Sequence, residues 1–269
     1  MVSTHSNFRT IAALVLLFIV CAVTVSLGRW QLHRADERRA LTDAMQAARS
    51  LPPLDVTAAT AQAELTPWRP ARVTGTWLPE RTVLLENRNH LGRPGYWIAT
   101  PLRLDDRPEQ DLAVLVLRGW MPRALEATPT PETPPPAPSG QQTIEGELMS
   151  HVPRLFELGS GQHSRLPQHI EVGPGEAPPV VQNLELSVYG IAADLDLVPA
   201  VLMQIRPADD GLVHDWPQPA LNYNQNQGYA FQWFAFASIA ACAWLVVAWR
   251  AARRKWAARP GSIDPPGSS

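Results

Sequence analysis

Histidines and paired carboxylates are the residues that could carry metal or acid–base chemistry in this sequence, and their spacing favours neither. No His-x₃-His or His-Glu-x-x-His pattern occurs, and His163 and His169 lie in a segment rich in Gly and Pro. The two Asp-Asp pairs, at 105–106 and 209–210, fall in polar, turn-like segments where solvated side chains are usual. We therefore expect solvated loop histidines and turn carboxylates rather than a catalytic or metal site.

Sequence signatures of nucleophilic, phosphate-binding and redox chemistry are missing as well. There is no Gly-x-Ser-x-Gly elbow, no phosphate-binding loop, no Gly-x-Gly-x-x-Gly and no Cys-x-x-Cys-His. Both cysteines, Cys21 and Cys242, lie in long apolar stretches, so the region between those stretches has no disulfide and no thiolate metal ligand. We do not expect an enzyme, and the alternative of a membrane-anchored hydrolase would need a nucleophile–base pair that the spacing does not show.

Charge and composition narrow the class of protein further. The 269 residues include 23 basic and 25 acidic side chains, which gives a formal net charge of -2. A nucleic-acid partner is not expected, because it would favour a basic surface. The hydrophobic content of 45% excludes disorder throughout. The charged fraction of 18% is low against a typical ~25% because two long stretches carry no charge at all.

These two stretches, residues 10–28 and 229–249, predict membrane-spanning helices. A helix of 21 residues is roughly 31 Å long, which matches the hydrocarbon core of a bilayer. Burial in a soluble core is the alternative for the second stretch. A cleaved secretory signal is the alternative for the first, with Ser26 and Gly28 at plausible cleavage positions. An uncleaved anchor is favoured because the first apolar run exceeds the ~7–15 residues of a signal core.

The basic residues beside the spans predict how the chain is oriented. Five follow the second span: Arg250, Arg253, Arg254, Lys255 and Arg259. This end is therefore expected in the cytoplasm, or in a mitochondrial matrix. The basic residues around the first span favour the opposite orientation, because one arginine precedes the span and four follow it closely. Long loops, however, cross membranes largely regardless of their charge. We predict a multi-pass protein of the bacterial inner membrane with both termini, 1–9 and a basic, disordered tail at 250–269, in the cytoplasm. Residues 29–228 would form the periplasmic domain.

The pattern of the exported region predicts a mainly β domain of the antiparallel barrel or sandwich class. Residues 29–50 are rich in helix formers and should extend the first span. Strands are predicted at 71–77, 82–87, 96–104, 112–120, 143–148, 180–183 and 200–205. A turn is expected at 89–95, a Pro-rich connector at 128–140, and a helix at 184–197 that Pro199 stops.

Four ordered stretches resemble the Surfeit-locus-one family of cytochrome c oxidase biogenesis proteins. They are Leu27-Gly-Arg-Trp-Gln-Leu-His-Arg34, Val73-Thr-Gly-Thr-Trp-Leu-Pro-Glu80, the region from Arg93-Pro-Gly-Tyr-Trp-Ile-Ala-Thr-Pro101 to Val114-Leu-Val-Leu-Arg-Gly-Trp-Met-Pro122, and Tyr229-Ala-Phe-Gln-Trp-Phe234. The resemblance implies a non-enzymatic assembly factor with two spans around an exported β-rich domain. It implies help with haem a insertion into the oxidase catalytic subunit, with haem a as a transient cofactor. The implied partners are membrane lipid, that subunit and other assembly factors.

The resemblance also implies a site near the start of the second span. Family members often carry a haem-linked His three residues before the Tyr of the fourth stretch, and Asn226 occupies that position here. An amide is a poor axial iron ligand, so either haem is held otherwise or the protein is a scaffold without a cofactor. Tyr229 and Trp233 could form an interfacial aromatic belt, or with Gln232 a surface that meets a partner helix or a porphyrin edge. Arg118 has two interpretations, a structural corner paired with a carboxylate or a clamp for a haem propionate.

Overall fold

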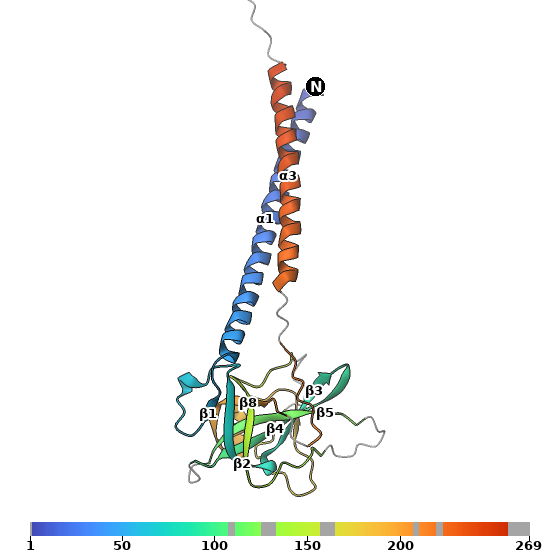
Figure 1. Ribbon diagram of the computed structural model, residues 1–269. Helices are drawn as coiled ribbons and strands as arrows, with labels where there is room; N and C mark the ends of the chain where they lie inside the picture. The colour runs from blue at the N-terminus through green and yellow to red at the C-terminus, as the bar shows by residue number, and fades with distance from the viewer. Residues whose placement is uncertain are drawn as a thin grey trace, which may run out of the picture. The chain divides into compact units, whose positions relative to one another are not determined.

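The computed structural model (Figure 1) describes residues 2–106, 111–124, 133–156, 165–206, 210–218 and 223–257. The chain divides into two compact units. One consists of residues 1–43 and 219–269, and its described residues form helices. The other, Ala44–Gln218, contains all the described strands and is called the β domain here.

Two long helices dominate the helical unit: α1 (Val2–Arg49), whose last turns belong to the β domain, and α3 (Tyr223–Ala257). Their segments Phe8–Arg49 and Gln225–Arg254 are long and apolar enough to cross a membrane, by length and composition. The predicted helix at 29–50 is thus continuous with the first apolar stretch. α3 continues past the predicted end of the second span, since no Gly or Pro interrupts it before Ala257. The rest of the predicted tail, 258–269, lies outside the described residues.

Small side chains let α1 and α3 approach closely within the helical unit. Thr24 on α1 and Ala230 and Ala237 on α3 are buried. Gly28 marks the tightest point, because a Cβ at this position would lie 2.9 Å from Cζ of Phe234. Small residues at helix contacts are typical of helix pairs that associate in membranes.

The β domain is built on a closed barrel of five strands. These are β2 (Pro70–Trp77), β6 (Gln141–Met149), β8 (Asp196–Gln204), β5 (Leu112–Pro122) and β4 (Arg93–Leu104), which pair in that order until β4 meets β2 again. Outside this ring, β1 (Leu54–Val56) pairs with β2, while β3 (Val83–His90) pairs with β4 and β7 (Val180–Val181) pairs with β3. One helix, α2 (Leu186–Ala193), and the short 3-10 helices Gln62–Glu64 and Pro79–Arg81 complete the described elements.

The predicted barrel is therefore present, but its strands are not all antiparallel. β1–β2, β3–β7 and β5–β8 are parallel pairs. The predicted stop at Pro199 is wrong, because α2 ends with Asp194 in the left-handed conformation, at φ 55. Pro199 instead lies within β8, between Leu197 and Val201, where the register with β5 shifts. A proline is tolerated at such an irregularity because the ladder needs no N–H there.

Two large apolar clusters form most of the core of this domain, and a smaller third cluster includes Leu84, Ile98 and Met121. The first draws on all five barrel strands, with Val73, Leu102, Val116, Leu148 and Leu202 fully buried, and it fills the barrel.

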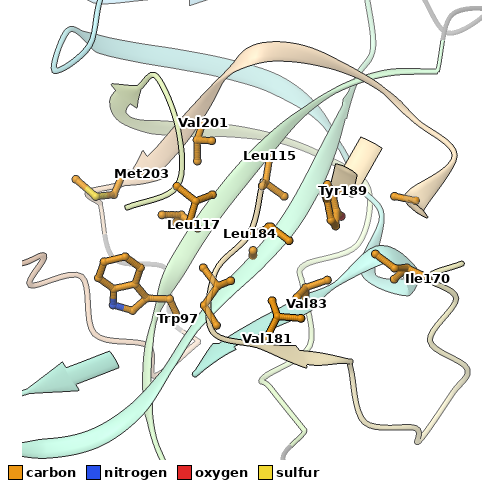
Figure 2. Packing of buried hydrophobic residues seen from close by; sticks show 14 of the residues in the cluster. Val83, Trp97, Leu115, Leu117, Ile170, Val181, Leu184, Tyr189, Val201 and Met203 are labelled. Atoms are coloured by element: carbon orange, nitrogen blue, oxygen red, sulfur yellow. The ribbon is translucent and has the colours of Figure 1, made fainter. Parts of the chain in front are cut away.

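The second cluster packs side chains of β4, β5 and β8, together with those of β3 and β7, against α2 and the segments around it. Figure 2 shows Leu115 and Leu117 of β5 beside Val201 and Met203 of β8, with Tyr189 of α2 in the same cluster. β5 is therefore buried on both faces, which explains why its sequence is a continuous apolar run rather than an alternating one.

Candidate functional site

The predicted site residues of α3 lie on a surface that α1 does not cover. Tyr229, Gln232 and Trp233 follow the spacing of one helical face, and the ring of Phe236 meets that of Trp233 edge-on with centroids 6.1 Å apart. Tyr229, Gln232 and Phe236 are exposed and Trp233 is half-buried. These four residues are called the α3 outer face here. Gln232 was expected to face a partner helix or a porphyrin edge, and α1 is not that partner.

Asn226 contacts α1 through both ends of its amide. Its Nδ2 donates a hydrogen bond to Oε1 of Gln31 at 3.0 Å, and its Oδ1 accepts one from Nη1 of Arg38 at 2.9 Å. Gln31 and Arg38 are seven residues apart, or two helical turns, so they lie on one face of α1. Gln31, Arg38 and Asn226 are called the interhelical amide bridge here.

Sequence reasoning did not single out Gln31 or Arg38. Their seven-residue spacing on a predicted helix was an available signal, and Gln31 belongs to the first family-like stretch. Their partner is 195 residues away from Gln31 in the chain. No local pattern could therefore identify Asn226 as that partner.

Arg118, in the β domain, lies at one end of the barrel interior. The pairing of β4 with β5 shifts between Ile98 and Ala99, which leaves Arg118 as the extra residue of a bulge. Its side chain points toward the barrel cluster, with the guanidinium 5.6 Å from the ring centroid of Trp77. Only 2% of the residue is exposed.

A carboxylate and two prolyl carbonyls surround the Arg118 guanidinium. Nη2 lies 3.1 Å from Oδ2 of Asp210, and the two η nitrogens donate to the carbonyl oxygens of Pro135 and Pro136 at 3.0 and 3.3 Å. Burial lowers the pKa of Arg118, and the Asp210 carboxylate opposes that shift. The carboxylate partner that the structural interpretation of Arg118 requires is Asp210. The predicted solvated turn is wrong for Asp210, whose side chain is 8% exposed, and Asp209 lies outside the described residues.

This arrangement also explains the described half of the Pro-rich connector. Residues 133–138 have no regular secondary structure, and Arg118 binds their backbone to the barrel end. Residues 128–132 of the predicted connector lie outside the described part of the chain.

A second buried arginine, Arg88, was missed by sequence reasoning. Its guanidinium lies 4.4 Å from the ring centroid of Trp97, and Nη2 donates to the carbonyl oxygen of Gln182 at 3.0 Å. Only 4% of the residue is exposed, and burial lowers its pKa to about 10. Among the residues that the structure describes, no carboxylate lies within ion-pair distance of Arg88.

The histidines fall into different environments. His169 is exposed, as predicted, and His163 lies outside the described residues. His90 is half-buried, with Nε2 3.1 Å from Oδ2 of Asp215 and its ring centroid 5.0 Å from that of Trp120. In the described ranges, no group of three or more His, Cys, Asp or Glu side chains could hold a metal ion.

Comparisons with known proteins all identify the same family. The sequence model of the SURF1 family matches residues 18–238. The SURF1-like proteins of Rickettsia conorii and Rickettsia felis are 33% and 32% identical over 107 and 106 residues, each covering 39% of this chain, and 42% and 44% of the relative. The SURF1-like protein of Monosiga brevicollis is 23% identical over 263 residues, covering 93% of this chain and 91% of the relative.

The matched segment spans about two fifths of the length of the rickettsial relatives. The family match, in contrast, takes in most of α1, the whole β domain and the part of α3 that carries its outer face. On this evidence the chain belongs to the SURF1 family, whose members are known in general as oxidase assembly factors.

Proposed function

We propose that this protein assists the maturation of the catalytic subunit of a haem–copper cytochrome c oxidase at the stage of haem a insertion, without catalysing a reaction. Membership of the SURF1 family supports a role in oxidase assembly. The α3 outer face is the observation that carries the proposed mode of action. It combines aromatic rings with the exposed amide of Gln232, which would need a hydrogen-bonding partner within a membrane. A helix of the client subunit supplies such a partner.

In this proposal α1 and α3 cross the bacterial inner membrane and the β domain is periplasmic. Large apolar side chains on both helices are more than half exposed, among them Phe18, Ile19, Ile239 and Leu245. In a membrane, lipid tails would surround these side chains. In water, the same exposed apolar surface would be unfavourable. The arginines that follow the second span support cytoplasmic termini. Lipid, the oxidase catalytic subunit and other assembly factors are the proposed partners.

Two positions that bear on haem a, Asn226 and Arg118, are already engaged in contacts within the protein. Asn226 uses both ends of its amide in the interhelical amide bridge, and an amide is a poor iron ligand. Arg118 already binds Asp210 and two carbonyl groups, and only 2% of the residue is exposed, so a propionate would have to displace these partners. These contacts favour a scaffold that holds the client subunit rather than the cofactor.

The oxidase content of cells tests the assembly role. A deletion strain should lose the haem a absorbance while its other cytochromes persist, and the native gene should restore it. A variant with Gln232→Leu and Trp233→Ala should restore much less haem a absorbance, whereas the control Ile239→Ala, at another exposed position of α3, should restore it fully. Equal restoration by both variants would overturn the role of the α3 outer face.

The absorbance spectrum of the purified protein tests the cofactor-free mode. Protein isolated from cells that make haem a should show no Soret band near one haem per chain. The variant Asn226→His, which provides an imidazole, should gain Soret absorbance relative to the control Asn226→Gln. A stoichiometric Soret band in the unmodified protein would overturn the cofactor-free mode and leave the assembly role intact.

A further inference from the structure

The outer side of α2 carries exposed apolar side chains. Its inner side packs into the second cluster through Tyr189, Ala192 and Ala193, which are all buried. Val188 and Ile191 are one helical turn apart on the outer side, where they are 50% and 82% exposed. A helix that packs on a domain normally turns its apolar residues inward. These two side chains are therefore available to a partner.

Ile191 lines a groove between α2 and the neighbouring strand ends. One hollow of about 860 Å³ is lined by Gly190, Ile191 and Leu195 together with Leu112, the first residue of β5. A second hollow of about 470 Å³ shares Gly190, Ile191 and Leu195 and reaches Pro199 in β8. The two hollows form one continuous surface, called the α2 groove here. A small-molecule site would enclose most of its ligand, whereas this groove is open at Ile191, so it suits a segment of a protein.

Three carboxylates surround the α2 groove. Asp194 caps the end of α2, Asp196 begins β8, and Asp111 precedes Leu112, which pairs with Asp196. None of the three takes part in the ion pairs that the described residues form. Within the same ranges, no group of three or more acidic, His or Cys side chains could hold a metal ion. A bound metal ion therefore does not account for these charges.

The three charges are unfavourable within the domain itself. The carboxyl end of a helix carries partial negative charge, which basic side chains usually offset, but the last turn of α2 contains none. Asp194 has φ 55, a conformation in which glycine or asparagine is usual at a helix end. The backbone completes this cap, since the N–H of Leu195 donates to the carbonyl oxygen of Gly190 at 3.0 Å. Folding alone therefore does not explain a carboxylate at this position.

The α2 groove lies at the opposite end of β8 from the two boundaries of the domain. Nη2 of Arg49 donates to Oε1 of Gln218 at 2.8 Å and to Oε2 of Glu147 at 3.0 Å, so both boundaries meet beside β6. Glu147 pairs with Met203, near the end of β8, whereas the groove adjoins Asp196, its first residue. A partner could therefore occupy the groove without displacing these contacts.

We propose that the α2 groove binds a segment of a partner protein in which Arg or Lys stands beside large apolar side chains. The apolar side chains would pack on Val188 and Ile191, and the cations would face Asp111, Asp194 and Asp196. A cation at this end of α2 would reduce the repulsion among the carboxylates and offset the helix dipole. The proposal goes beyond the oxidase role, because it concerns the β domain alone and requires neither the α3 outer face nor membrane insertion.

Photo-crosslinking of the full-length protein in its native cells tests this surface. The photoreactive residue p-benzoylphenylalanine replaces Ile191, and mass spectrometry identifies the crosslinked peptide. We expect an adduct with a segment of another protein that has a net positive charge and large apolar side chains. The matched control places the same residue at Leu91, which is apolar and 85% exposed but adjoins Arg93 across the β3–β4 turn. The same adduct at both positions, or none at position 191, would overturn the proposal.

Charge variants test the role of the carboxylates. Asp111→Asn, Asp194→Asn and Asp196→Asn together should lower the yield of the position-191 adduct several-fold. The control Asp55→Asn, Glu64→Gln and Glu86→Gln makes the same change in net charge elsewhere in the β domain, at residues that also have no ion pair among the described residues. This control should leave the yield unchanged. Equal yields in the two variants would overturn the proposed charge complementarity.

Thermal unfolding separates binding from folding. In the purified full-length protein in detergent, the triple variant of the groove should raise the Tm by roughly 1–4 °C, because it removes like charges from the negative end of a helix. A fall in Tm would show that the three carboxylates serve the fold and would overturn the proposal.

Other occupants of the groove would give different adducts. An adduct with a second copy of this chain would identify a self-association surface, and an adduct with a neutral or acidic segment would identify a partner of another chemistry. Either result would overturn the proposal. Neither would affect the assembly role, which the haem a absorbance of the deletion strain tests separately.

Discussion

The two buried arginines of the β domain differ in what compensates their charge. Arg118 has a buried carboxylate, Asp210, and two prolyl carbonyls as partners. Arg88 has the face of Trp97 and one carbonyl oxygen, and no carboxylate among the described residues. Burial lowers the pKa of both guanidinium groups. The same side chain is therefore used in two ways within one domain.

The difference shows which arginine is coupled to its surroundings. A buried ion pair is costly to break because the remaining partner keeps an uncompensated charge. Removal of either Arg118 or Asp210 should therefore destabilise the other. It should also weaken the attachment of residues 133–138 to the barrel. Removal of Arg88 leaves no carboxylate of the described residues without its partner, so Arg88 should act mainly through its packing on Trp97.

Removal of the counter-ion of Arg118 should have the largest effect. Asp210→Ala should lower the free energy of unfolding by about 3–5 kcal/mol, because it leaves the buried guanidinium without a counter-charge. Tryptophan fluorescence during chemical denaturation of the purified protein in detergent would measure this loss. Asp215→Ala is the control, since the Asp215 side chain is 74% exposed and its contact with His90 should contribute only about 0–1 kcal/mol. Equal losses in the two variants would contradict the coupling.

Loss of the interhelical amide bridge should have an intermediate effect. Asn226→Leu removes the two hydrogen bonds that Asn226 makes to α1 and should weaken the helix pair by about 0.6–2 kcal/mol, the usual range for polar contacts between membrane helices. A double-mutant cycle with Gln31→Leu, followed by thermal unfolding in detergent, would measure the coupling. Strict additivity of the two substitutions would contradict a direct contact.

Replacement of Arg88, which has no carboxylate partner among the described residues, should have a smaller effect. Arg88→Met keeps the aliphatic stem against Trp97 and removes a desolvated charge, so the free energy of unfolding should change by no more than about 1 kcal/mol. Arg118→Met should cost about 3–5 kcal/mol in the same denaturation experiment, because Asp210 is left buried and charged. A loss in Arg88→Met as large as in Arg118→Met would remove the distinction between the two sites.

The pH dependence of stability should be the smallest effect. It concerns His214, which interacts with both Asp210 and Arg118. Burial lowers the pKa of His214 from its ordinary value, although the Asp210 carboxylate opposes the shift. The unfolded chain therefore binds more protons once the pH falls below about 6.5, and stability decreases with falling pH. Thermal unfolding of the native protein should shift to lower temperature between pH about 7.5 and about 5.5. His214→Gln should reduce this shift, and an unchanged profile would contradict the assignment.

The elements that could be predicted from the sequence are those with strong local patterns. The two long helices follow from uninterrupted apolar and helix-forming residues, and β5 follows from an apolar run that is buried on both faces. The parallel pairing of β5 with β8 had no local signal, because it depends on the chain crossing the domain before β8 begins. β1 was missed because three residues are too few to show a period.

The candidate site was predictable only in part, for a similar reason. Arg118 stood out as a charged residue at the end of an apolar strand, which made a carboxylate partner a reasonable alternative. Asp210, however, is 92 residues away from it in the chain and was interpreted as a solvated turn residue. Arg88 was missed because it lies in a polar stretch, where nothing local indicates that Trp97 and Gln182 will enclose it.

The contact between Arg49 and Gln218 has a practical consequence for how this domain can be handled. Because both boundaries of the β domain emerge side by side, the domain has the geometry of an insert that can be moved as one piece. A short linker joining the two boundaries would close the polypeptide without spanning the barrel. New ends could then be opened in a surface loop, which makes this domain a candidate for circular permutation.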